Sequence, residues 1–489
     1  FMEKIKSFIQ NRPEAACLIT LAIFCVAFLF IGLNSYPLVD VDETRYAVMS
    51  RGLIGSGDWS ILLLNGVPFT EKPPLFFWLT AFSIKYLGFN EFAVRFPTAI
   101  LATLIVFFTY FTGKTIISRK FGMYSALILL STVFFLVLSH VAILDMTFTV
   151  FLTAAIYCGL LTSFCKDEHK KLYWLGFYVA MGLAFLAKGL LAFVIPVAVV
   201  GLYRLITKDV KEIFKPVNII PGMIVFFAII LPWHIHMYQV YGYRFIYDYF
   251  ILHHFERLVN AEVLGKTRPF LYFVPVFLVG FLPWSIAFMI FLIKKCRRLI
   301  KRIKTKTLYY TFDTNERKLI LFLSIYFVLV FLLFSMASGK LPTYILPAFP
   351  AAAMLTGLFF YRKPMDYFNA SLIVALLANF IMVGFVFDQI YKGGMDELVE
   401  YAEMAQEDNK KLVTFDMPVK PSVLINYREK VDFITRRDFE ALDKQLDFDN
   451  DCYVIMKNKH IEEDDYKNEL MKHLIKIKSG DKYTIYAEP

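Results

Sequence analysis

YPLVDVDETRYAVMSRGLIGSGDWSILLLNGVPFTEKPP, residues 36–74, is a polar stretch that separates the first long apolar run of the chain from all the later ones. Two segments in it, VDETRY (41–46) and TEKPP (70–74), place acidic side chains next to basic ones. Charges at the edge of a bilayer are costly to desolvate, and in membrane proteins they mark functional sites. We therefore expect the reaction centre of a membrane enzyme here, with Asp42 and Glu43 as adjacent carboxylates.

The composition places the chain in a lipid bilayer. Of its 489 residues, 58% are hydrophobic and 19% are charged, whereas soluble chains are about 45–50% apolar. The formal net charge of +10 is then expected from basic loops that face anionic headgroups, and it does not indicate nucleic-acid binding. The six cysteines show no metal-binding or redox spacing, so no disulfide is expected.

Eleven apolar runs approach the roughly 20 residues that cross the hydrocarbon core of a membrane. They lie at about 14–34, 92–113, 121–139, 146–165, 172–187, 190–206, 217–236, 269–293, 318–337, 342–361 and 367–387. Segment 74–88 is shorter and amphipathic, which predicts a helix at the membrane interface. One or two further spans would give about 11–13 transmembrane helices in all.

The positive-inside rule orients these runs. Alternate connections are rich in Lys and Arg: 114–120, 166–171, 204–215, 294–306 and 362–363. With these connections in the cytoplasm, the N-terminus lies inside and the C-terminus outside. Most of the unusual polar residues then share the outer face, which suggests a common site there.

Two domains are expected. Residues 1–388 form the membrane domain, with a large first outer loop at 35–91. Residues 389–489 contain a helical pattern at 395–408 and β-like runs at 411–415, 431–435, 452–457 and 483–487, with helical patterns at 436–446 and 462–474. Strands that alternate with helices indicate a small α/β domain, for which we expect a lid or scaffold role because it has no nucleotide-binding glycine motif.

An ordered set of motifs continues through the membrane region. It comprises VDETRY (41–46), SGDW (56–59), NGVPFTEKPP (65–74), VAILD (141–145), LAKG (186–189), LPW (231–233), HHFER (253–257), LPW (282–284) and SGKLPTYILP (338–347). In this order the motifs resemble the polyprenyl-phosphate-sugar-dependent glycosyltransferases of the GT-C type. Within that class the chain looks most similar to the bacterial lipid A aminoarabinose transferases, and the protein O-mannosyltransferases are more distant. The resemblance weakens after residue 390.

The resemblance implies an all-α polytopic membrane domain of the GT-C type, followed by the small α/β domain, in the bacterial inner membrane with a periplasmic C-terminus. It implies inverting transfer of a sugar, expected to be an amino sugar, from an undecaprenyl-phosphate-linked donor to lipid A on the periplasmic face. Membrane lipids surround the protein, and no nucleic acid is involved.

Cationic side chains are expected to stabilise the carrier phosphate as it leaves, because charge grows on it in the transition state. Lys72 is the first candidate, and Lys188 follows because a charge is expensive in its apolar context, FLAKGLLAF. Arg45, Arg257 and Lys340 complete the set. For Lys72 the alternative is a snorkelling lysine with its own salt bridge to Glu71.

Asp42 is the candidate general base, or the carboxylate that steers the acceptor. The alternative is a surface acid paired with Arg45. The same motif makes Glu43 a second catalytic candidate beside Asp42. For Glu43, however, we favour a role in supporting the fold of the loop. The motif also assigns Tyr46 to substrate binding.

The remaining candidates for substrate binding each have a plainer alternative. Asp145 could instead cap the following helix, and Tyr344 could be an interfacial aromatic anchor. His254 with Glu71 could hold a divalent ion, but scattered ligands of this kind have no diagnostic spacing. No cofactor is therefore expected, and the metal stays an alternative.

Two other functions remain open. Transfer to protein Ser or Thr would require a base for the acceptor hydroxyl, whereas a phosphate acceptor is already anionic. A lipid-sugar flippase or transporter would show inverted repeats and a polar site at the midplane, and the sequence contains neither pattern.

Overall fold

The structure is a computed structural model, and the chain forms two compact units. The structure describes residues 11–256, 268–304, 314–337, 339–391, 395–415, 420–425, 427, 431–434, 452–458 and 474–487. The first unit comprises Phe1–Leu33, Thr70–Phe76 and Arg95–Gly384, and the second comprises Asn34–Phe69, Phe77–Val94 and Phe385–Pro489. Most of the first outer connection, apart from Thr70–Phe76, therefore belongs to the same unit as the C-terminal residues.

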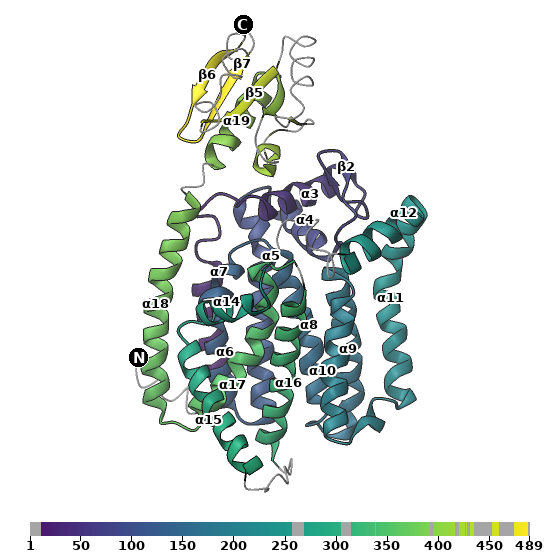
Figure 1. Ribbon diagram of the computed structural model, residues 1–489, viewed down its shortest axis with the longest axis vertical. Coiled ribbons are helices and arrows are strands. Elements are labelled where there is room, and N and C mark those ends of the chain that lie inside the picture. The colour runs from purple at the N-terminus through teal and green to yellow at the C-terminus, as the bar shows by residue number, and fades with distance from the viewer. Residues whose placement is uncertain are drawn as a thin grey trace. The chain divides into compact units, whose positions relative to one another are not determined.

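The first unit is a bundle of helices (Figure 1). Wholly or in part, its elements are α2 (Pro13–Cys25), η1 (Val26–Phe30), α4 (Leu75–Leu87), α5 (Glu91–Ile116), α6 (Arg119–Leu130), α7 (Val133–Ser139), α8 (Leu144–Leu161), α9 (Asp167–Lys188), α10 (Leu191–Ile206), η2 (Val210–Glu212), α11 (Pro216–Tyr241), α12 (Tyr243–Ile246), η3 (Tyr247–Glu256), η5 (Phe270–Tyr272), α14 (Phe273–Gly280), α15 (Ser285–Lys304), α16 (Asn315–Met336), η6 (Pro342–Ala348), α17 (Phe349–Tyr361) and α18 (Met365–Tyr391).

Six of the described helical segments are long and apolar enough to cross a membrane, and the bent pair α6–α7 would be a seventh. The six are Pro13–Phe30, Glu91–Ile116, Leu144–Leu161, Pro216–Tyr241, Asn315–Met336 and Pro342–Tyr361. Helices α4 and α10, η5 together with α14, and Met365–Ile381 of α18 are apolar but shorter. The predicted polytopic helical domain is thereby confirmed, whereas the prediction that every apolar run forms one continuous span is wrong at two positions.

The first break lies at Ser131 and Thr132, where α6 and α7 meet at 67°. Both side chains bond back to carbonyls of α6, Ser131 to Leu127 at 2.5 Å and Thr132 to Leu129 at 2.6 Å. Such local bonds compete with the helical ladder. The freed Ser131 carbonyl accepts a hydrogen bond from the Asn379 amide at 2.6 Å, so the break leaves this polar group paired inside the bundle.

The second break lies in the LPW motif at 282–284, where α14 ends and α15 begins. Pro283 has no N–H and disfavours a helical conformation for the residue before it. The predicted span 269–293 is therefore two helices.

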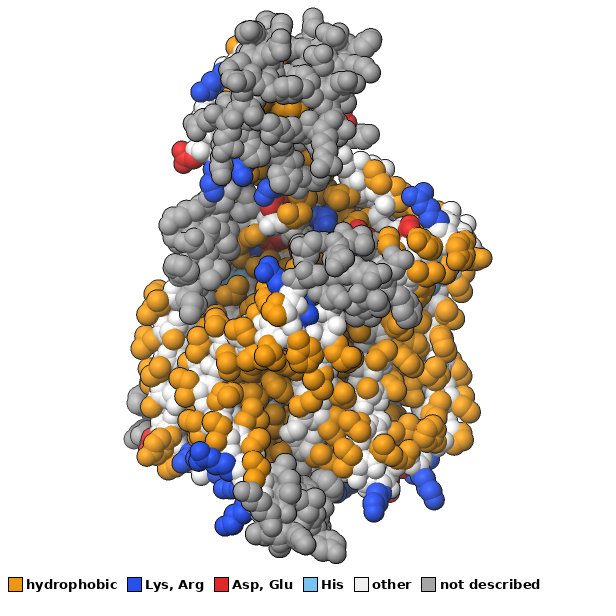
Figure 2. All heavy atoms as spheres, viewed as in Figure 1, with side chains coloured by type: hydrophobic (Ala, Val, Ile, Leu, Met, Phe, Trp, Pro, Cys, Tyr) orange, Lys and Arg blue, Asp and Glu red, His pale blue; other side chains and the backbone are white. Residues whose placement is uncertain are grey.

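The core of the first unit lies around α8 and α17. Most residues of these spans are buried, 83% in each, against 17% for the first span. Helix α9 packs against α8 and α11, and α17 packs against α6 and α16. At Gly357 of α17, a Cβ atom would lie 2.6 Å from the Ser125 hydroxyl, so the close approach of α17 to α6 requires glycine here. On the face drawn in Figure 2, hydrophobic side chains cover this unit.

The second unit contains a five-stranded sheet. Its elements are α3 (Asp42–Ser56), the short hairpin β1 (Leu63–Leu64) and β2 (Val67–Pro68), α19 (Met395–Glu407), β3 (Lys411–Phe415), η7 (Pro421–Leu424), β4 (Asp432–Ile434), β5 (Cys452–Lys457), β6 (Ile475–Ser479) and β7 (Tyr483–Ala487). The strand order is β4-β3-β5-β7-β6, with β3 parallel to β4 and β5, and β7 antiparallel to β5 and β6.

The predicted small α/β domain is confirmed, with helix 395–408 and four strands close to their predicted positions. The fifth strand, β6, was not predicted. The predicted helices 436–446 and 462–474 lie outside the described residues, apart from Leu474.

Candidate active site

Three of the predicted site residues meet in the first unit. Asp145 lies in the first turn of α8, Lys188 is the last residue of α9, and Tyr344 belongs to η6. The Lys188 ammonium donates to Asp145 Oδ1 and lies 4.1 Å from the centre of the Tyr344 ring. One acid, one base and one aromatic ring from three elements thus form a single cluster.

The helix ends explain why this cluster forms. Asp145 sits near the positive end of the α8 dipole and Lys188 near the negative end of the α9 dipole, so each charge is favoured where it lies. The α8 cap position is Ile143, which has no capping side chain, so Asp145 does not occupy the capping position proposed as its plainer role. The side chains of Lys188 and Asp145 are only 11% and 16% exposed, which makes the pair mostly buried.

Lys340 is a second cation in this unit. It is 5% exposed, and its ammonium donates to the Arg268 carbonyl at 3.0 Å. That bond is to a neutral group and does not neutralise the charge. Burial lowers the pKa of Lys340 below its usual value, because the charged form is the one that burial penalises.

Lys72 and Glu71 belong to the same unit, on the segment Thr70–Phe76. Both are half-buried, and the two prolines that follow them are buried at the start of α4. The backbone of His254 lies in η3, while its side chain and the whole of Arg257 fall outside the described residues. No three His, Cys, Asp or Glu side chains among the residues described gather as a possible metal site. A metal held by His254 and Glu71 therefore stays a hypothesis.

The predicted acidic pair opens α3 in the second unit. Asp42 is the first residue of that helix, 49% exposed, and pairs with Arg45 one turn on. Glu43 is 1% exposed and accepts the Val39 N–H at 2.8 Å. The two neighbouring carboxylates therefore differ: Asp42 faces solvent, while Glu43 holds the backbone before the helix.

Arg45 is held by aromatic rings as well as by Asp42. Its guanidinium carbon lies 5.5 Å from the centre of the Tyr46 ring and 5.7 Å from that of Phe69. Tyr46 is buried and packs edge-on against Phe77 at 5.4 Å. The Tyr46 side chain thus supports the position of Arg45.

Sequence reasoning missed Asp40, which ties α3 to the C-terminal residues. Its side chain is 3% exposed. It accepts the Ser422 N–H at 3.0 Å, the Ser422 hydroxyl at 2.7 Å and the Thr44 hydroxyl at 2.5 Å. Asp40 is the first of three acids in DVDE, so composition could have identified it, but its partner is 382 residues away and no spacing rule connects them.

Two further links join the same segments. Arg51 of α3 donates to the carbonyls of Leu424 and Ile425, the former at 2.7 Å. The Asn65 side chain donates to the Val431 carbonyl at 2.8 Å and accepts the Val431 N–H at 3.0 Å. The segment that carries Asp42 is therefore positioned by the C-terminal α/β residues.

Comparison with known proteins gives matches to one class of enzyme. Residues 71–236 match the family model described as dolichyl-phosphate-mannose-protein mannosyltransferase. The chain is 31% identical over 342 residues to the undecaprenyl phosphate-alpha-4-amino-4-deoxy-L-arabinose arabinosyl transferase of Yersinia enterocolitica. It is 29% identical over 354 residues to arabinosyl transferase 2 of the same name from Proteus mirabilis. These alignments cover 68% and 71% of the chain but only 57% and 60% of the relatives.

Solved structures share the fold. The crystal structure of ArnT from Cupriavidus metallidurans bound to undecaprenyl phosphate superposes with a TM-score of 0.78 at 19% identity, over 97% of this chain and 98% of that one. The oligosaccharyltransferase AglB of Archaeoglobus fulgidus gives a TM-score of 0.54 at 13% identity, over 92% of this chain and 70% of that one.

Proposed function

Because this chain has the GT-C fold and is a homologue of the bacterial aminoarabinose transferases, we propose that it is a membrane glycosyltransferase that moves an amino sugar from undecaprenyl phosphate to lipid A. The reaction takes place on the periplasmic face of the bacterial inner membrane. The observation that carries the proposal is the alignment over 342 residues to a transferase whose name specifies this donor and this sugar.

The transfer exchanges one bond at the anomeric carbon for another. The acceptor oxygen attacks that carbon from the side opposite the carrier, the bond to the carrier phosphate breaks, and undecaprenyl phosphate leaves with the electron pair. A hydroxyl acceptor gives its proton to a base, for which Asp42 is our candidate. A phosphate acceptor needs no proton removed, and Asp42 would then position the amino sugar.

Within the first unit, Lys72, Lys188 and Lys340 are our candidates for stabilising the departing phosphate. Lys340 offers an ammonium whose one described hydrogen bond is to a carbonyl. Lys188 shares its charge with Asp145, so a phosphate would have to compete with that carboxylate. We therefore assign Lys188 to positioning the phosphate and Lys340 to neutralising it.

Mass spectrometry of lipid A tests the proposal. Cells that express this chain should gain a lipid A species heavier by one pentosamine, and a strain with Asp42→Asn should lose most of that species. An unchanged lipid A in expressing cells would contradict the proposal.

A second function is favoured by one specific observation. The family model that matches residues 71–236 describes transferases that act on protein. Glycosylated proteins with an unchanged lipid A would identify a protein Ser/Thr acceptor, and Asp42 would then be required as a base.

A further inference from the structure

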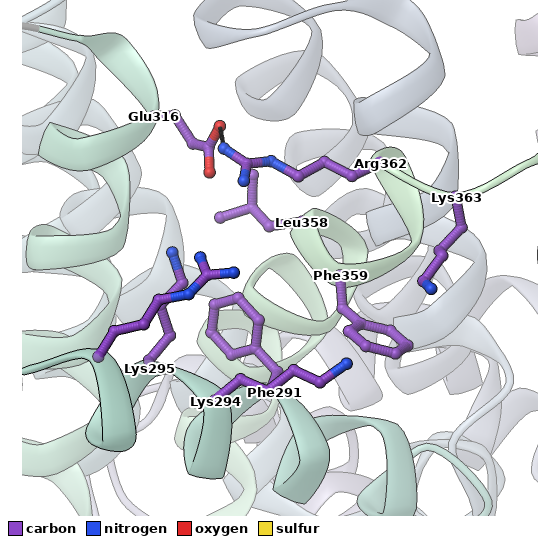
Figure 3. A pocket seen from close by; sticks show the side chains of 9 residues that line it. Phe291, Lys294, Lys295, Glu316, Leu358, Phe359, Arg362 and Lys363 are labelled. Carbon is purple, nitrogen blue, oxygen red and sulfur yellow. Dashed lines mark hydrogen bonds and ion pairs between the residues drawn. The ribbon is translucent and has the colours of Figure 1, made fainter. Parts of the chain in front are cut away.

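A basic pocket of about 230 Å³ lies at one end of the first unit, and none of the residues assigned above lines it (Figure 3). It is lined by the middle of α15, the first turn of α16, the last turn of α17 and the residues that follow α17 (Figure 3). Five of the side chains that line it are cationic, Lys294, Lys295, Arg298, Arg362 and Lys363, and one, Glu316, is acidic.

Among the described side chains that line this pocket, the cations outnumber the single carboxylate. Glu316 pairs with Arg362 at 2.5 Å, which accounts for one cation. Lys294 and Lys363, from different elements, both lie over the Phe359 ring, at 5.5 Å and 6.0 Å from its centre. Figure 3 shows the two ammonium groups beside that ring. Like charges gathered this closely repel one another, so an anion in the pocket would be stabilising.

The size of the pocket restricts that anion. About 230 Å³ is several times the roughly 30 Å³ share of one water molecule. It is also below the roughly 300–1,000 Å³ of sites for drug-sized ligands. A phosphate group fits this range.

The surroundings indicate where the phosphate comes from. Helix α15 changes from apolar to basic at residue 294, and Met289, Ile290 and Ile293, in the turns before the pocket, are exposed. Exposed apolar side chains next to a cationic pocket match the two halves of a lipid, acyl chains and headgroup. We propose that this pocket binds the phosphate of an anionic phospholipid in the surrounding leaflet. The inference does not depend on the sugar transfer.

Lipid binding to the purified full-length protein tests the proposal. The protein is reconstituted in phosphatidylcholine nanodiscs with and without phosphatidylglycerol, and bound lipid is measured by native mass spectrometry. Replacing Lys294 and Arg298 together by Gln should weaken phosphatidylglycerol binding about 10- to 30-fold, since each basic residue at a membrane surface contributes about one factor of five.

The matched control removes two charges from the same helix outside the pocket. Arg297 and Lys301 are exposed on α15 and do not line the cavity. Their joint replacement by Gln should change binding less than about threefold, because long-range attraction is screened by salt. An equal loss in this control would overturn the proposal, as it would show general attraction between a basic helix and the membrane.

Two further measurements complete the test. The charge-conserving pair Lys294→Arg and Arg298→Lys should retain binding, and Lys363→Gln repeats the test from another element if the first variant is unstable. Inorganic phosphate, added to phosphatidylcholine nanodiscs, should bind far more weakly than the lipid. Tight binding of free phosphate without preference for phosphatidylglycerol would overturn the lipid assignment.

Discussion

At the residue scale, the Lys188 ammonium is shared between a carboxylate and an aromatic ring, and a double-mutant cycle separates its roles. Lys188→Gln leaves Asp145 charged and mostly buried, which should cost about 3–5 kcal/mol of stability. The double variant with Asp145→Asn should recover much of that loss because no lone charge remains. If Lys188 binds the donor phosphate, turnover stays low in the double variant. Recovery of turnover together with thermal stability would show that the pair is structural.

Lys340 predicts a dependence on pH with a definite sign. Its ammonium is charged below its pKa, and burial lowers that pKa from the usual 10.5. As the pH rises through the lowered pKa, the charge that would hold the phosphate is lost, so kcat/KM, which reports the free enzyme, should fall on the alkaline side at a lower pH than an exposed lysine would give. Lys340→Arg should move this limb upward, because arginine stays protonated.

Stability should change in the opposite direction over the same window. Between the lowered pKa and the usual one, the unfolded chain binds more protons than the folded chain, so the free energy of unfolding rises with pH. For kcat/KM, an alkaline fall at the same pH in Lys340→Arg as in the parent would show that another group titrates.

Asp42 predicts a loss of turnover without a loss of stability. Its pair with Arg45 is half-exposed, and such pairs contribute only about 0–1 kcal/mol. Asp42→Asn should therefore leave folding and donor affinity close to normal, while turnover falls about 10²–10⁴-fold if the carboxylate acts as an acid–base group. Arg45→Gln breaks the same pair and keeps the carboxylate, so a change in stability that both variants share comes from the ion pair. Near-normal turnover in Asp42→Asn would remove this carboxylate from the mechanism.

The sequence identified charged residues in apolar surroundings, where a charge costs free energy. It did not predict which of these residues lie in contact in the folded protein. Asp145, Lys188 and Tyr344 were each identified from an acid or base in an apolar run or from a motif. Their convergence depends on the start of α8, the end of α9 and η6 lying together in the bundle, which no local spacing encodes. The bond from Asp40 to Ser422 was missed for the same reason.

At the element scale, the sequence predicted helices and strands in which hydrophobic residues recur with a clear period. It did not predict the breaks within helices. Strand β5 (CYVIMK) is almost wholly buried and was found at its observed bounds. Strand β6 (IKIKS) has all five residues exposed at the edge of the sheet, where lysines protect against further pairing. In β6, apolar and lysine residues alternate over only a few positions, directly after the predicted helix 462–474. This pattern was too short to indicate a separate strand. The break at Ser131 has no proline, and its cause is the side-chain bonds to the preceding turn.

The contact between α3 and η7 predicts a measurable coupling. Asp40→Asn removes a charged acceptor of two bonds from Ser422, and hydrogen bonds to charged groups contribute about 1.5–3 kcal/mol. The segment after residue 395 should then be cleaved faster in limited proteolysis, and turnover should fall because α3 loses its support. Glu400→Gln, an exposed carboxylate in the same unit, should leave cleavage within about twofold of the parent. Unchanged cleavage in Asp40→Asn would mean that Arg51 and Asn65 alone hold the contact.

At the scale of the whole molecule, the units differ from the linear division expected from composition. The change in character near residue 388 suggested an independent C-terminal domain, but residues 34–69 and 77–94 belong to the same compact unit as the sheet. Val48 and Leu64 pack against its core with Leu398 and Tyr401. This packing supports a scaffold role for the C-terminal residues, which hold helix α3. Deleting these residues should therefore affect the position of Asp42 more than that of Lys188.

Orientation in the membrane gives the last prediction. The basic connections predict that the end of α15 faces the cytoplasm and that the sheet faces the periplasm. Lys301 and Asp481 are both exposed, so single cysteines there suit labelling of intact cells. The background must first lose Cys296, an exposed thiol on α15. An impermeant maleimide should label Asp481→Cys in intact cells, and Lys301→Cys only after the inner membrane is opened. Labelling of Lys301→Cys from outside would invert the topology and place Asp145, Lys188 and Lys340 on the side where no periplasmic acceptor could reach them.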